Sequence, residues 1–401
     1  MRKIFFLLLL SGGCTYAQEC GTDELHQYRM QHEPGYAQQL EELESQIQQR
    51  LADRQTTVNE TYYIPIVVHV INTGGAVGTG NNISNSQITN AIDGMNDRFA
   101  NLTGFGADAG IVFCLADTDP DGNPTTGIVR VNATAVPGYA QYGVVHSASP
   151  TCLGVSSNTL KDLSKWPVYD YYNIWVVNSI CSSSGSLAGY ATYPNSTDNP
   201  YYGMVIRSDY FSILQTTPAH EMGHGLFLYH TFEGDVNDTT CPGNTNCNLF
   251  GDRVCDTPPH KRSNCGTTTE CSTQTPFANS AHNYMSYCSV RNRFTQNQSD
   301  RMRATVSSLP FANVEPCGTL GRTETAAVRV DWYPNPANGK LNIIGTEKQG
   351  RIEIWNSHGQ MLYESSIDKA DTIDISHFAT GVYLVKFHNQ ETTTTKKLII
   401  K

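Results

Sequence analysis

Charged side chains are scarce in this chain of 401 residues. Lysine, arginine, aspartate and glutamate together make up 16% of it, well below the roughly 25% of an average soluble protein. Basic residues are the scarcer class, with 27 lysines and arginines against 37 acidic residues, and the formal net charge is −10. A nucleic acid favours basic surfaces, so this balance argues against nucleic acid as a partner.

Long hydrophobic runs are also missing. The apolar run Ile4–Leu10 is too short to span a bilayer, and no later segment is apolar enough, so we expect no transmembrane segment. The run follows two positive charges and precedes small residues, a pattern that predicts a signal peptide over residues 1–18. Cys14 leaves a lipoprotein as the alternative, although the leucine expected three residues before a lipidated cysteine is absent.

Cysteine, by contrast, is frequent. Of twelve cysteines, eleven remain without Cys14, and in an exported chain most of them are expected to form disulfides. Six lie between residues 241 and 288, in a stretch poor in apolar residues, where disulfides must supply much of the order. Eleven is an odd number, and Cys20 is the best candidate for the unpaired thiol.

The segment HEMGHGLFLYH, residues 220–230, concentrates metal-binding side chains. On a helix expected over 213–226, His220 and His224 project from one face. Glu221 is turned about 100° from His220, so it reaches a metal-bound water without being a ligand. His230 supplies the third ligand that a catalytic zinc site needs. The plain alternative is a helix that carries histidines and binds no metal.

This segment resembles the extended metzincin motif HExxHxxGxxH, and with residues 231–234 it resembles the pappalysin/cytophagalysin family. Further stretches carry the same resemblance: IPIVVHVI (64–71), YYNIWVVN (171–178), GYATYP (189–194), GDRVCDTPPH (251–260), NYMSY (283–287) and FTQNQSDRM (294–302). NYMSY is similar to the Met-turn, and GYATYP to the substrate-binding edge. The resemblance covers roughly residues 58–316.

The resemblance implies an α/β (α+β) catalytic domain at residues 58–316 that binds one zinc ion through His220, His224 and His230. Glu221 would be the general base on a zinc-bound water and then the acid to the leaving amine. Met285 would form a hydrophobic floor beneath the metal. Tyr287 matches a family tyrosine that can hydrogen-bond the tetrahedral oxyanion, with simple aromatic packing as the alternative.

The start of the predicted mature chain, Cys20-Gly21-Thr22, resembles the motif that begins propeptides in this family. Residues 19–57 would form a propeptide whose Cys20 thiolate occupies the open zinc position and keeps a zymogen latent. A disulfide or an idle N-terminal thiol are the alternatives for Cys20. Arg50 and Arg54 are plausible maturation sites.

One position departs from the family pattern. The motif has glycine where this chain has Phe227, at the sharp turn between the helix and the third ligand. An aromatic residue at positive φ costs about 1–3 kcal/mol. We therefore expect Gly225 to take the left-handed position and the helix to end elsewhere.

Calcium is a second expected cofactor. Asp252, Asp256 and Thr257, with Glu233 as a neighbour, offer the hard oxygen ligands that suit Ca²⁺, and the family resemblance supports such a structural site. Plain turns are the alternative. Residues 288–293, which follow the segment similar to the Met-turn, contain no acidic side chain, so we expect no strict preference for a basic residue after the cut.

Hydrophobic patterns predict strands and helices in alternation before the histidine segment. Strands are expected at 61–72, 111–116, 127–131, 173–178 and 204–206, the last as an edge strand, and helices at 37–54 and 83–101. This alternation suits an α/β half, and the loop-rich stretch after residue 230 suits the other half of a metzincin.

After a linker at 317–328, the pattern changes to short alternating strands separated by turns, which predicts a small β-sandwich over 329–401. YPNPANGKLNI (333–343) and the terminal KLIIK resemble the type A sorting domain of the type IX secretion system. That implies export through the periplasm to the cell surface or the medium, with the secretion machinery as partner. A carbohydrate-binding or adhesive sandwich is the alternative.

The leading hypothesis is a secreted zinc-dependent endopeptidase that is made as a zymogen and hydrolyses peptide bonds in protein or peptide substrates. The second is a catalytically impaired zinc-binding or adhesive surface protein, spoiled by the turn at Phe227. The third is a different zinc enzyme with Glu233 as third ligand. Physiological substrate, disulfide pairing, maturation protease and oligomeric state are open at this stage.

Truncating the chain before residue 329 is expected to abolish its release, because the sorting signal would be gone while the signal peptide still directs transfer to the periplasm. Immunoblots of medium, outer membrane and periplasm of the producing cell measure this. Secretion at the level of the full chain would exclude a sorting role for residues 329–401.

Overall fold

The computed structural model describes residues 20–53, 60–146, 152–183, 185–194, 199–243, 245–273, 276–309, 331–344, 350–356, 361–367, 370–388 and 393–401. The predicted signal peptide and the linker at 317–328 lie outside these residues. The chain divides into two compact units, Met1–Gly321 and Arg322–Lys401, which are described separately.

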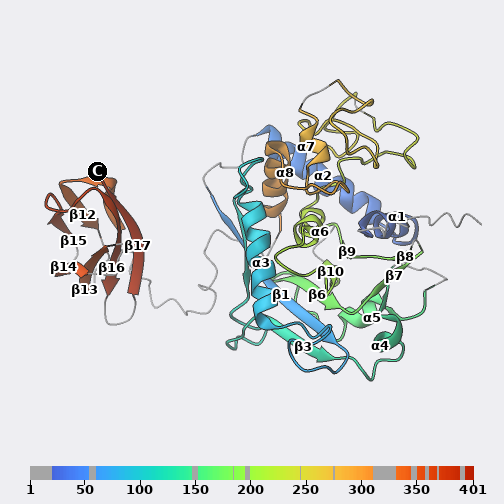
Figure 1. Cartoon of the computed structure of the whole chain (residues 1–401), viewed down its shortest axis with the longest axis horizontal. Coiled ribbons are helices and arrows are strands. Elements are labelled where there is room, and N and C mark those ends of the chain that lie inside the picture. Colours follow the sequence, from blue (N-terminus) through green and yellow to red (C-terminus); the bar gives the residue numbers. More distant parts are fainter. Residues whose placement is uncertain are drawn as a thin grey trace, which may run out of the picture. The chain divides into compact units, whose positions relative to one another are not determined.

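A six-stranded sheet organises the first unit (Figure 1). Its strands are β1 (Tyr62–Asn72), β2 (Ile111–Leu115), β3 (Ile128–Asn132), β6 (Tyr172–Val177), β9 (Gly189–Ala191) and β10 (Gly203–Arg207). The order is β2-β1-β6-β10-β9, with β3 pairing the second half of β1, and only β10 and β9 pair antiparallel. The predicted α/β class is thus confirmed.

Both faces of this sheet are covered, which explains the nearly continuous apolar runs of its strands. Alternate β1 residues from Ile64 to Val70 pack in one core with α3 (Asn85–Phe99) and α6 (Thr217–Gly225). Trp175 and Val205 face the other way, with α4 (Tyr139–Tyr142), α5 (Ser157–Lys161) and a small sheet of β4 (Val144–Val145), β5 (Val155–Ser156), β7 (Ile180–Ser182) and β8 (Gly185–Ser186).

Most predicted elements of this unit are present, but of the two segments expected at an edge only residues 189–194, which contain β9, lie there. Residues 204–206 lie inside β10, which is flanked by β6 and β9. Within the described part of the sheet the edge is β9, because its other side carries no named strand. The helix predicted at 83–101 is α3, where Ser84 caps the start by accepting the Gln87 amide at 3.1 Å.

Disulfides order the loops that follow α6, as predicted. Three bonds lie there, Cys241–Cys271, Cys247–Cys255 and Cys265–Cys288, and Cys152–Cys181 lies nearer the sheet. The region holds little regular structure besides α7 (Ala278–Ala281) and the capped α8 (Gln296–Val306). Cross-links that restrict the unfolded chain therefore replace part of the missing apolar core.

Two N-terminal helices pack on the first unit: α1 (Thr22–His32), which was not predicted, and α2 (Tyr36–Ala52), which matches the helix predicted at 37–54. The side chain of Glu44 on α2 accepts two hydrogen bonds from Arg301 on α8, at 2.8 and 2.6 Å. Arg253 adds an ion pair to Glu44 at 2.8 Å. Burial opposes ionisation of Glu44, but the hydrogen bonds from Arg301 outweigh it and lower its pKa to about 2.

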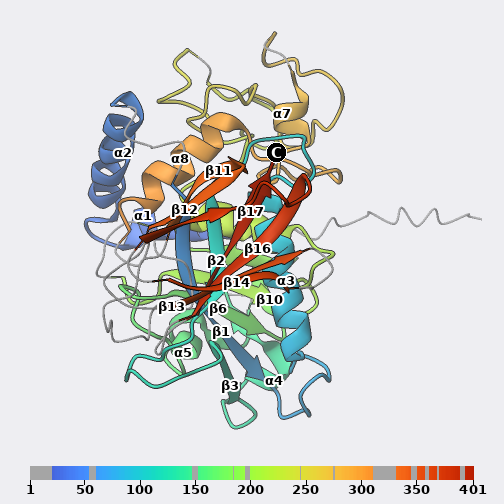
Figure 2. The same cartoon turned by 90° about the vertical axis from the view of Figure 1, so that its left-hand side faces the viewer.

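The second unit contains a seven-stranded sheet whose strands are seen in another orientation in Figure 2. They are β11 (Asp331–Asn338), β12 (Lys340–Ile344), β13 (Gly350–Asn356), β14 (Met361–Ile367), β15 (Ala370–Asp374), β16 (Gly381–His388) and β17 (Thr393–Ile400). Their order is β14-β13-β16-β17-β11-β12-β15, around an apolar core that includes Leu341, Ile354 and Val385. This confirms a small all-β C-terminal domain. No helix among the described residues is long and apolar enough to cross a membrane.

Replacing Glu44 with glutamine is expected to loosen the N-terminal helices. Arg301 is only 1% exposed, and removing one partner of a buried ion pair costs about 3–5 kcal/mol. Limited trypsin digestion of the full chain measures the effect as the rate of cleavage within α2, which should rise at least about tenfold as the helix opens more often. Glu41→Gln, on an exposed side chain of the same helix, is the matched control. Equal rates for the two variants would contradict this anchoring role.

Candidate metal and active site

Helix α6 carries the first two candidate ligands. It begins with Pro218 in its first turn and runs over Thr217–Gly225, shorter than the 213–226 expected from sequence. Its register places His220 and His224 one turn apart, with their Nε2 atoms 3.2 Å from each other. All residues of this helix are buried, so the site is built into the core.

The helix ends at a tight turn centred on Phe227. The Phe227 amide donates to the His224 carbonyl and the Leu228 amide to the Gly223 carbonyl, both at 2.9 Å, the hydrogen-bond pattern of a Schellman motif. Phe227 itself takes the left-handed conformation, with φ of 66°. The expectation that Gly225 would do so was wrong, since Gly225 belongs to the helix.

Side-chain packing explains why a glycine occupies position 225 and an aromatic residue position 227. A β-carbon on Gly225 would collide with the hydroxyl of Tyr172, so this position serves close contact rather than backbone freedom. The Phe227 ring is fully buried beside Tyr193 and Tyr229, and Arg301 stacks over it at 5.0 Å while donating Nε to its carbonyl at 3.0 Å. Burial of the aromatic ring offsets the backbone strain of about 1–3 kcal/mol.

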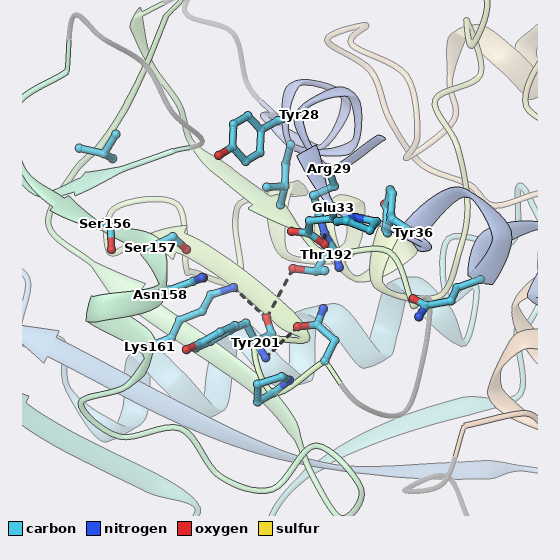
Figure 3. Close-up of a pocket in the computed structure, with 16 residues that line it drawn as sticks. Tyr28, Arg29, Glu33, Tyr36, Ser156, Ser157, Asn158, Lys161, Thr192 and Tyr201 are labelled. Carbon is cyan, nitrogen blue, oxygen red and sulfur yellow. Dashed lines mark hydrogen bonds and ion pairs between the residues drawn. The ribbon is translucent and has the colours of Figure 1, made fainter. Parts of the chain in front are cut away.

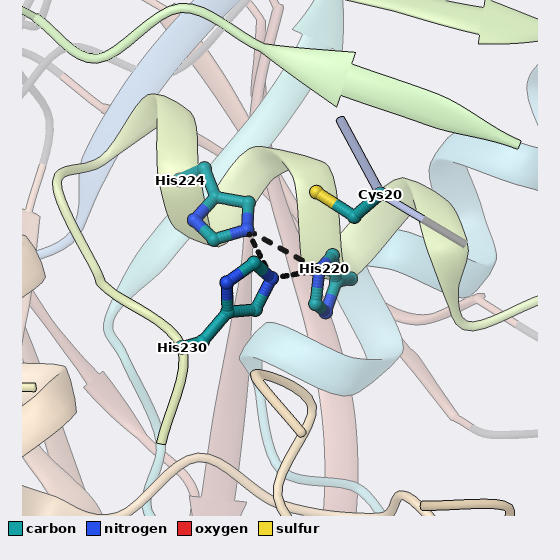
Figure 4. Close-up of side chains that lie close together, drawn as sticks. All are labelled: Cys20, His220, His224 and His230. Carbon is teal, nitrogen blue, oxygen red and sulfur yellow. Dashed lines mark hydrogen bonds between the residues drawn. The ribbon is translucent and has the colours of Figure 1, made fainter. Parts of the chain in front are cut away.

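The turn places the His230 side chain next to those of His220 and His224. Its Nε2 lies 3.1 Å from that of His224 and 3.2 Å from that of His220. The Sγ atom of Cys20 completes the group, with all four donor atoms within 4.8 Å of one another (Figure 4). The three predicted zinc ligands and the predicted latency cysteine are therefore brought to one point.

The far nitrogen of each imidazole has an oxygen partner. Nδ1 of His220 donates to the Tyr284 carbonyl at 2.6 Å, and that of His224 to the Leu228 carbonyl at 2.8 Å. Nδ1 of His230 donates to the Asp23 carboxylate at 2.9 Å. These bonds favour the tautomer with a free lone pair on Nε2. Burial, followed by the neighbouring histidines, lowers the pKa of His220 well below its usual value and that of His224 to about 3.

This arrangement fits a zinc ion. Three imidazoles bring their Nε2 atoms to a common centre, where the lone pairs of neutral rings repel one another unless a cation lies between them. Tetrahedral coordination with Zn–N bonds of about 2.0–2.1 Å places the nitrogens roughly 3.4 Å apart, close to the observed 3.1–3.2 Å. The donor set and the buried outer hydrogen bonds would suit a catalytic zinc ion, with the Cys20 thiol as a fourth donor in the position that such a site leaves open.

Glu221 and Cys20 meet beside this centre. The Cys20 thiol donates to Oε2 of Glu221 at 3.5 Å, and both residues are fully buried. Burial, then the charges of Glu221 and Asp23, raises the pKa of the Cys20 thiol well above its usual value. A divalent cation would reverse this preference, because a coordinating thiol is deprotonated. Among the described residues Cys20 takes part in no disulfide, which argues against the disulfide alternative.

The residues around Cys20 occupy the edge of the sheet. Cys20 and Gly189 form a parallel bridge, and the Gly21 amide donates to the Gly189 carbonyl at 3.0 Å. The Ala191 amide donates to the Thr22 hydroxyl at 3.0 Å. The N-terminal segment thus uses the hydrogen-bonding groups of β9 that an extended peptide would need.

Met285 and Tyr287 lie where the Met-turn resemblance implied. Met285 is fully buried beneath α6, and a β-carbon on Gly223 would collide with its sulfur. The Tyr287 ring lies 4.8 Å from the His230 ring, and its hydroxyl donates to the Cys20 carbonyl at 3.3 Å. The Tyr287 ring also meets the Phe232 ring edge to face and lies under the Arg262 guanidinium, so it packs as an aromatic while its hydroxyl contacts the Cys20 carbonyl.

The four residues expected to bind calcium lie in the loops beyond the histidines. Thr257 donates its hydroxyl to Asp252 at 2.7 Å, and Asp256 accepts the Asn297 amide at 3.0 Å. Glu233 lies close to Asp23 and His230, and the charge of Asp252 also acts on it. Burial raises the pKa of Asp252 and of Glu233 to about 8, and it outweighs the charges of Arg301 near Asp252 and of Arg253 near Glu233.

Sequence reasoning missed the outer residues of the site. Asp23 was not predicted, although it lies only three residues after the cysteine that was. The pairing of Glu44 with Arg301 left no local signal, since 257 positions separate them. The carbonyls of Tyr284 and Leu228 belong to the backbone and have no signature in residue type.

Comparison with known proteins identifies both parts of the chain. Residues 155–307 match the family described as pregnancy-associated plasma protein-A, and residues 331–401 match the secretion system C-terminal sorting domain. Residues 155–307 belong to the pappalysin family of metallopeptidases. The sorting-domain match confirms the predicted sorting domain and, with it, a secreted or cell-surface location.

Individual relatives agree with the pappalysin assignment. An extracellular metalloprotease of Sordaria macrospora is 30% identical over 189 residues, which cover 41% of this chain and 61% of that protein. Human pappalysin-1 is 29% identical over 48% of this chain but only 13% of its own length. Among solved structures, a mutant of Tannerella forsythia promirolysin is similar over 72% of this chain and 93% of its own, with 26% identity and a TM-score of 0.52. The alignment spans less than two thirds of the Sordaria relative.

Proposed function

We propose that this protein is a secreted zinc-dependent endopeptidase made as a latent zymogen. The convergence of three imidazole Nε2 atoms within 3.2 Å, beside the buried carboxylate of Glu221, carries this proposal. The pappalysin-family domain and extracellular metalloprotease relatives support it. Residues 329–401 would direct export through type IX secretion machinery.

His220, His224 and His230 would hold the zinc ion. When bound, zinc supplies Lewis acidity that polarises a substrate carbonyl and acidifies water. Glu221 accepts the proton of the attacking water and delivers it to the leaving amine, because its carboxylate is the base next to the metal position. The Tyr287 hydroxyl, once released from the Cys20 carbonyl, donates a hydrogen bond to the oxyanion.

The N-terminal segment would impose latency at three points. Cys20 supplies the fourth donor of the cluster, so no position is left for water. Residues 20–22 occupy the edge of β9, and the Cys20 carbonyl engages Tyr287. Cleavage near Arg50 or Arg54 would let the segment leave and free all three. Arg54 lies outside the described residues.

We also propose that Asp252, Asp256, Thr257 and Glu233 lie at a structural calcium site. Burial of two carboxylates with raised pKa values supports it, as does the buried Oδ1 of Asp256, which has no hydrogen-bond partner. A Ca²⁺ ion would stabilise the ionised carboxylates and tie the disulfide-rich loops together.

For substrates, we propose proteins or peptides bound in extended form along β9, without strict preference for a basic residue after the cut. Residues 288–293 contain no acidic side chain. Arg291 lies close enough to contribute, after burial and the neighbouring histidines, to the lowered pKa of His220, so its positive charge disfavours a basic side chain near the metal.

The alternative of an impaired zinc-binding or adhesive protein assumed that Phe227 distorts the turn and displaces His230 from the other two histidines. That turn keeps the hydrogen bonds of a Schellman motif and brings His230 to the other histidines. The alternative with Glu233 as third ligand loses its basis too, because His230 already completes the set. Neither is supported by a specific feature of the site.

Glu221→Ala is expected to bind one zinc ion per chain, as the native chain does, and to lose at least about 10²–10⁴-fold of its activity, since a general base is removed. Metal content is measured by elemental analysis of the full chain. Activity is measured after proteolytic removal of the N-terminal helices, on a denatured protein, with and without Ca²⁺.

Glu233→Gln serves as the matched control for that experiment. It should retain zinc, because His230 and not Glu233 is the third ligand. A native chain that binds zinc but cleaves nothing after removal of the N-terminal helices would contradict the proposed function. Loss of zinc in Glu233→Gln would favour the third hypothesis.

Cys20→Ala is expected to shorten the life of the zymogen. Removing the thiol opens the fourth position on the metal, so the intact chain should show activity before cleavage and lose its N-terminal segment faster. Gel analysis over time, with assays of the intact form, measures both. The double variant Cys20→Ala/Glu221→Ala tells self-cleavage from contaminating proteases. Maturation no faster than that of the native chain would exclude Cys20 as a latency residue.

A further inference from the structure

A cavity of about 560 Å³ lies between the N-terminal helices and the catalytic domain (Figure 3). None of the three candidate zinc ligands lines it. One wall comes from α1 and the residues that follow it, including Tyr28, Arg29 and Glu33. The opposite wall comes from α5 and the residues after β9, including Lys161 and Tyr201.

Lys161 is a buried cation without a described acidic partner. Its side chain stacks over the Trp175 ring, with Nζ at 4.7 Å from the ring centre, and Nζ donates to the Tyr201 carbonyl at 2.9 Å. Only 2% of the residue is exposed. Burial, and then the charge of Arg29, lowers the pKa of Lys161 to about 7. A buried ammonium is unfavourable unless an anion pairs with it.

Arg29 faces the same cavity from α1. Its Nε donates to Glu33 at 2.7 Å, and its guanidinium lies 4.2 Å from the centre of the Tyr36 ring. Its Nη1 is buried and has no hydrogen-bond partner. Two cations thus approach from opposite walls, and the one described carboxylate between them, that of Glu33, pairs with Arg29. The cavity therefore carries an excess of positive charge that favours an anionic group, and Lys161 contributes to that charge from the wall of the catalytic domain.

The cavity lies next to the end of β9, the strand along which we propose that the substrate binds. Thr192, which lines it, directly follows β9, the strand whose edge residues 20–22 occupy. Arg29 lies seven residues after Thr22 on α1, about 10 Å along the helix axis. An extended peptide covers that distance in about three residues. A peptide lying along β9 in place of this segment would reach the cavity about three or four residues from the one at the metal.

We propose that Lys161 and the wall around it bind an acidic side chain of the substrate once the N-terminal helices have left. This inference rests on the proposed endopeptidase function. Departure of α1 removes Arg29, which repels Lys161, and opens one wall of the cavity to the groove along β9. Asn158 and Thr192 line the same wall and offer hydrogen bonds to a carboxylate. Lys161 is then a specificity residue remote from the reacting atoms.

Arg291 is the competing source of a preference for acidic substrates. It lies near His220, so any preference that it imposes concerns residues next to the cleaved bond. Lys161 acts at a distance of about three or four residues. A preference for glutamate next to the cut would therefore point to Arg291. A preference three or four residues from the cut that is lost in Lys161→Met would point to Lys161.

The test uses zinc-loaded enzyme matured from the full chain and a neutral reference peptide that it cleaves. Glutamate is compared with glutamine at each of four positions on either side of the cut, as the ratio of kcat/KM values. We expect a ratio of about ten at one or two positions three or four residues from the cut, since a charge-assisted pair is worth about 1.5–3 kcal/mol. Lys161→Met should bring that ratio to about one. Lys165→Met, four residues along on a partly exposed side chain, removes the same charge and should keep it.

Each outcome decides the matter. A ratio near one at every remote position for native enzyme that does cleave the neutral peptide overturns this inference and leaves the proposed function standing. A remote preference that survives Lys161→Met, or that disappears equally in Lys165→Met, also overturns it. Failure of native enzyme to cleave the neutral peptide overturns the proposed function and this inference with it. The ratio is independent of the fraction of folded variant.

Discussion

The convergence of three imidazole nitrogens on one buried point is the constraint on which the rest of the first unit depends. Three histidines whose Nε2 atoms lie within 3.2 Å of one another need fixed orientations, and each orientation is set by a hydrogen bond at the opposite nitrogen. Two of those bonds come from backbone carbonyls, so the turn after α6 and the chain around Tyr284 must hold their places. Met285 beneath Gly223, and the sheet behind α6, provide the rigid support. A loosely built site would not keep three lone pairs together.

The N-terminal segment lies beside the three histidines and helps to hold one of them, His230, in position. Cys20 adds a fourth donor, and Asp23 supplies the acceptor for Nδ1 of His230. The same segment takes the edge of β9, while α2 is anchored through the buried pair of Glu44 and Arg301. Arg301 in turn stacks on Phe227, which forms the turn that positions His230. The proposed latency and the geometry of the candidate ligands would therefore share residues, and loss of the segment would change the surroundings of the proposed metal position as well as access to it.

Phe227 illustrates how a local rule can hold in general and fail at one position. A glycine is expected at a left-handed turn, because other residues are strained there. In this chain the strained residue is aromatic and fully buried between Tyr193, Tyr229 and Arg301, and the apolar contacts outweigh the strain. The nearby Gly225 is needed for a different reason, close approach to Tyr172. Residue type alone does not tell whether a glycine is required for its backbone conformation or for its small size. The sequence therefore favoured Gly225 for the left-handed position, which Phe227 takes.

The sequence by itself determined the candidate metal ligands, the candidate general base, Cys20 as the candidate latency residue, the disulfide-rich loops, most strands of the sheet and the β-rich sorting domain. Each of these depends on spacing, periodicity or residue count within a short stretch. Only the tertiary structure decided that β10 lies inside the sheet, that Asp23 holds His230, that Arg301 pairs with Glu44, and that Lys161 faces Arg29 across a cavity. These contacts join residues as far as 257 positions apart, and their energies come from burial and charge, which no local pattern records.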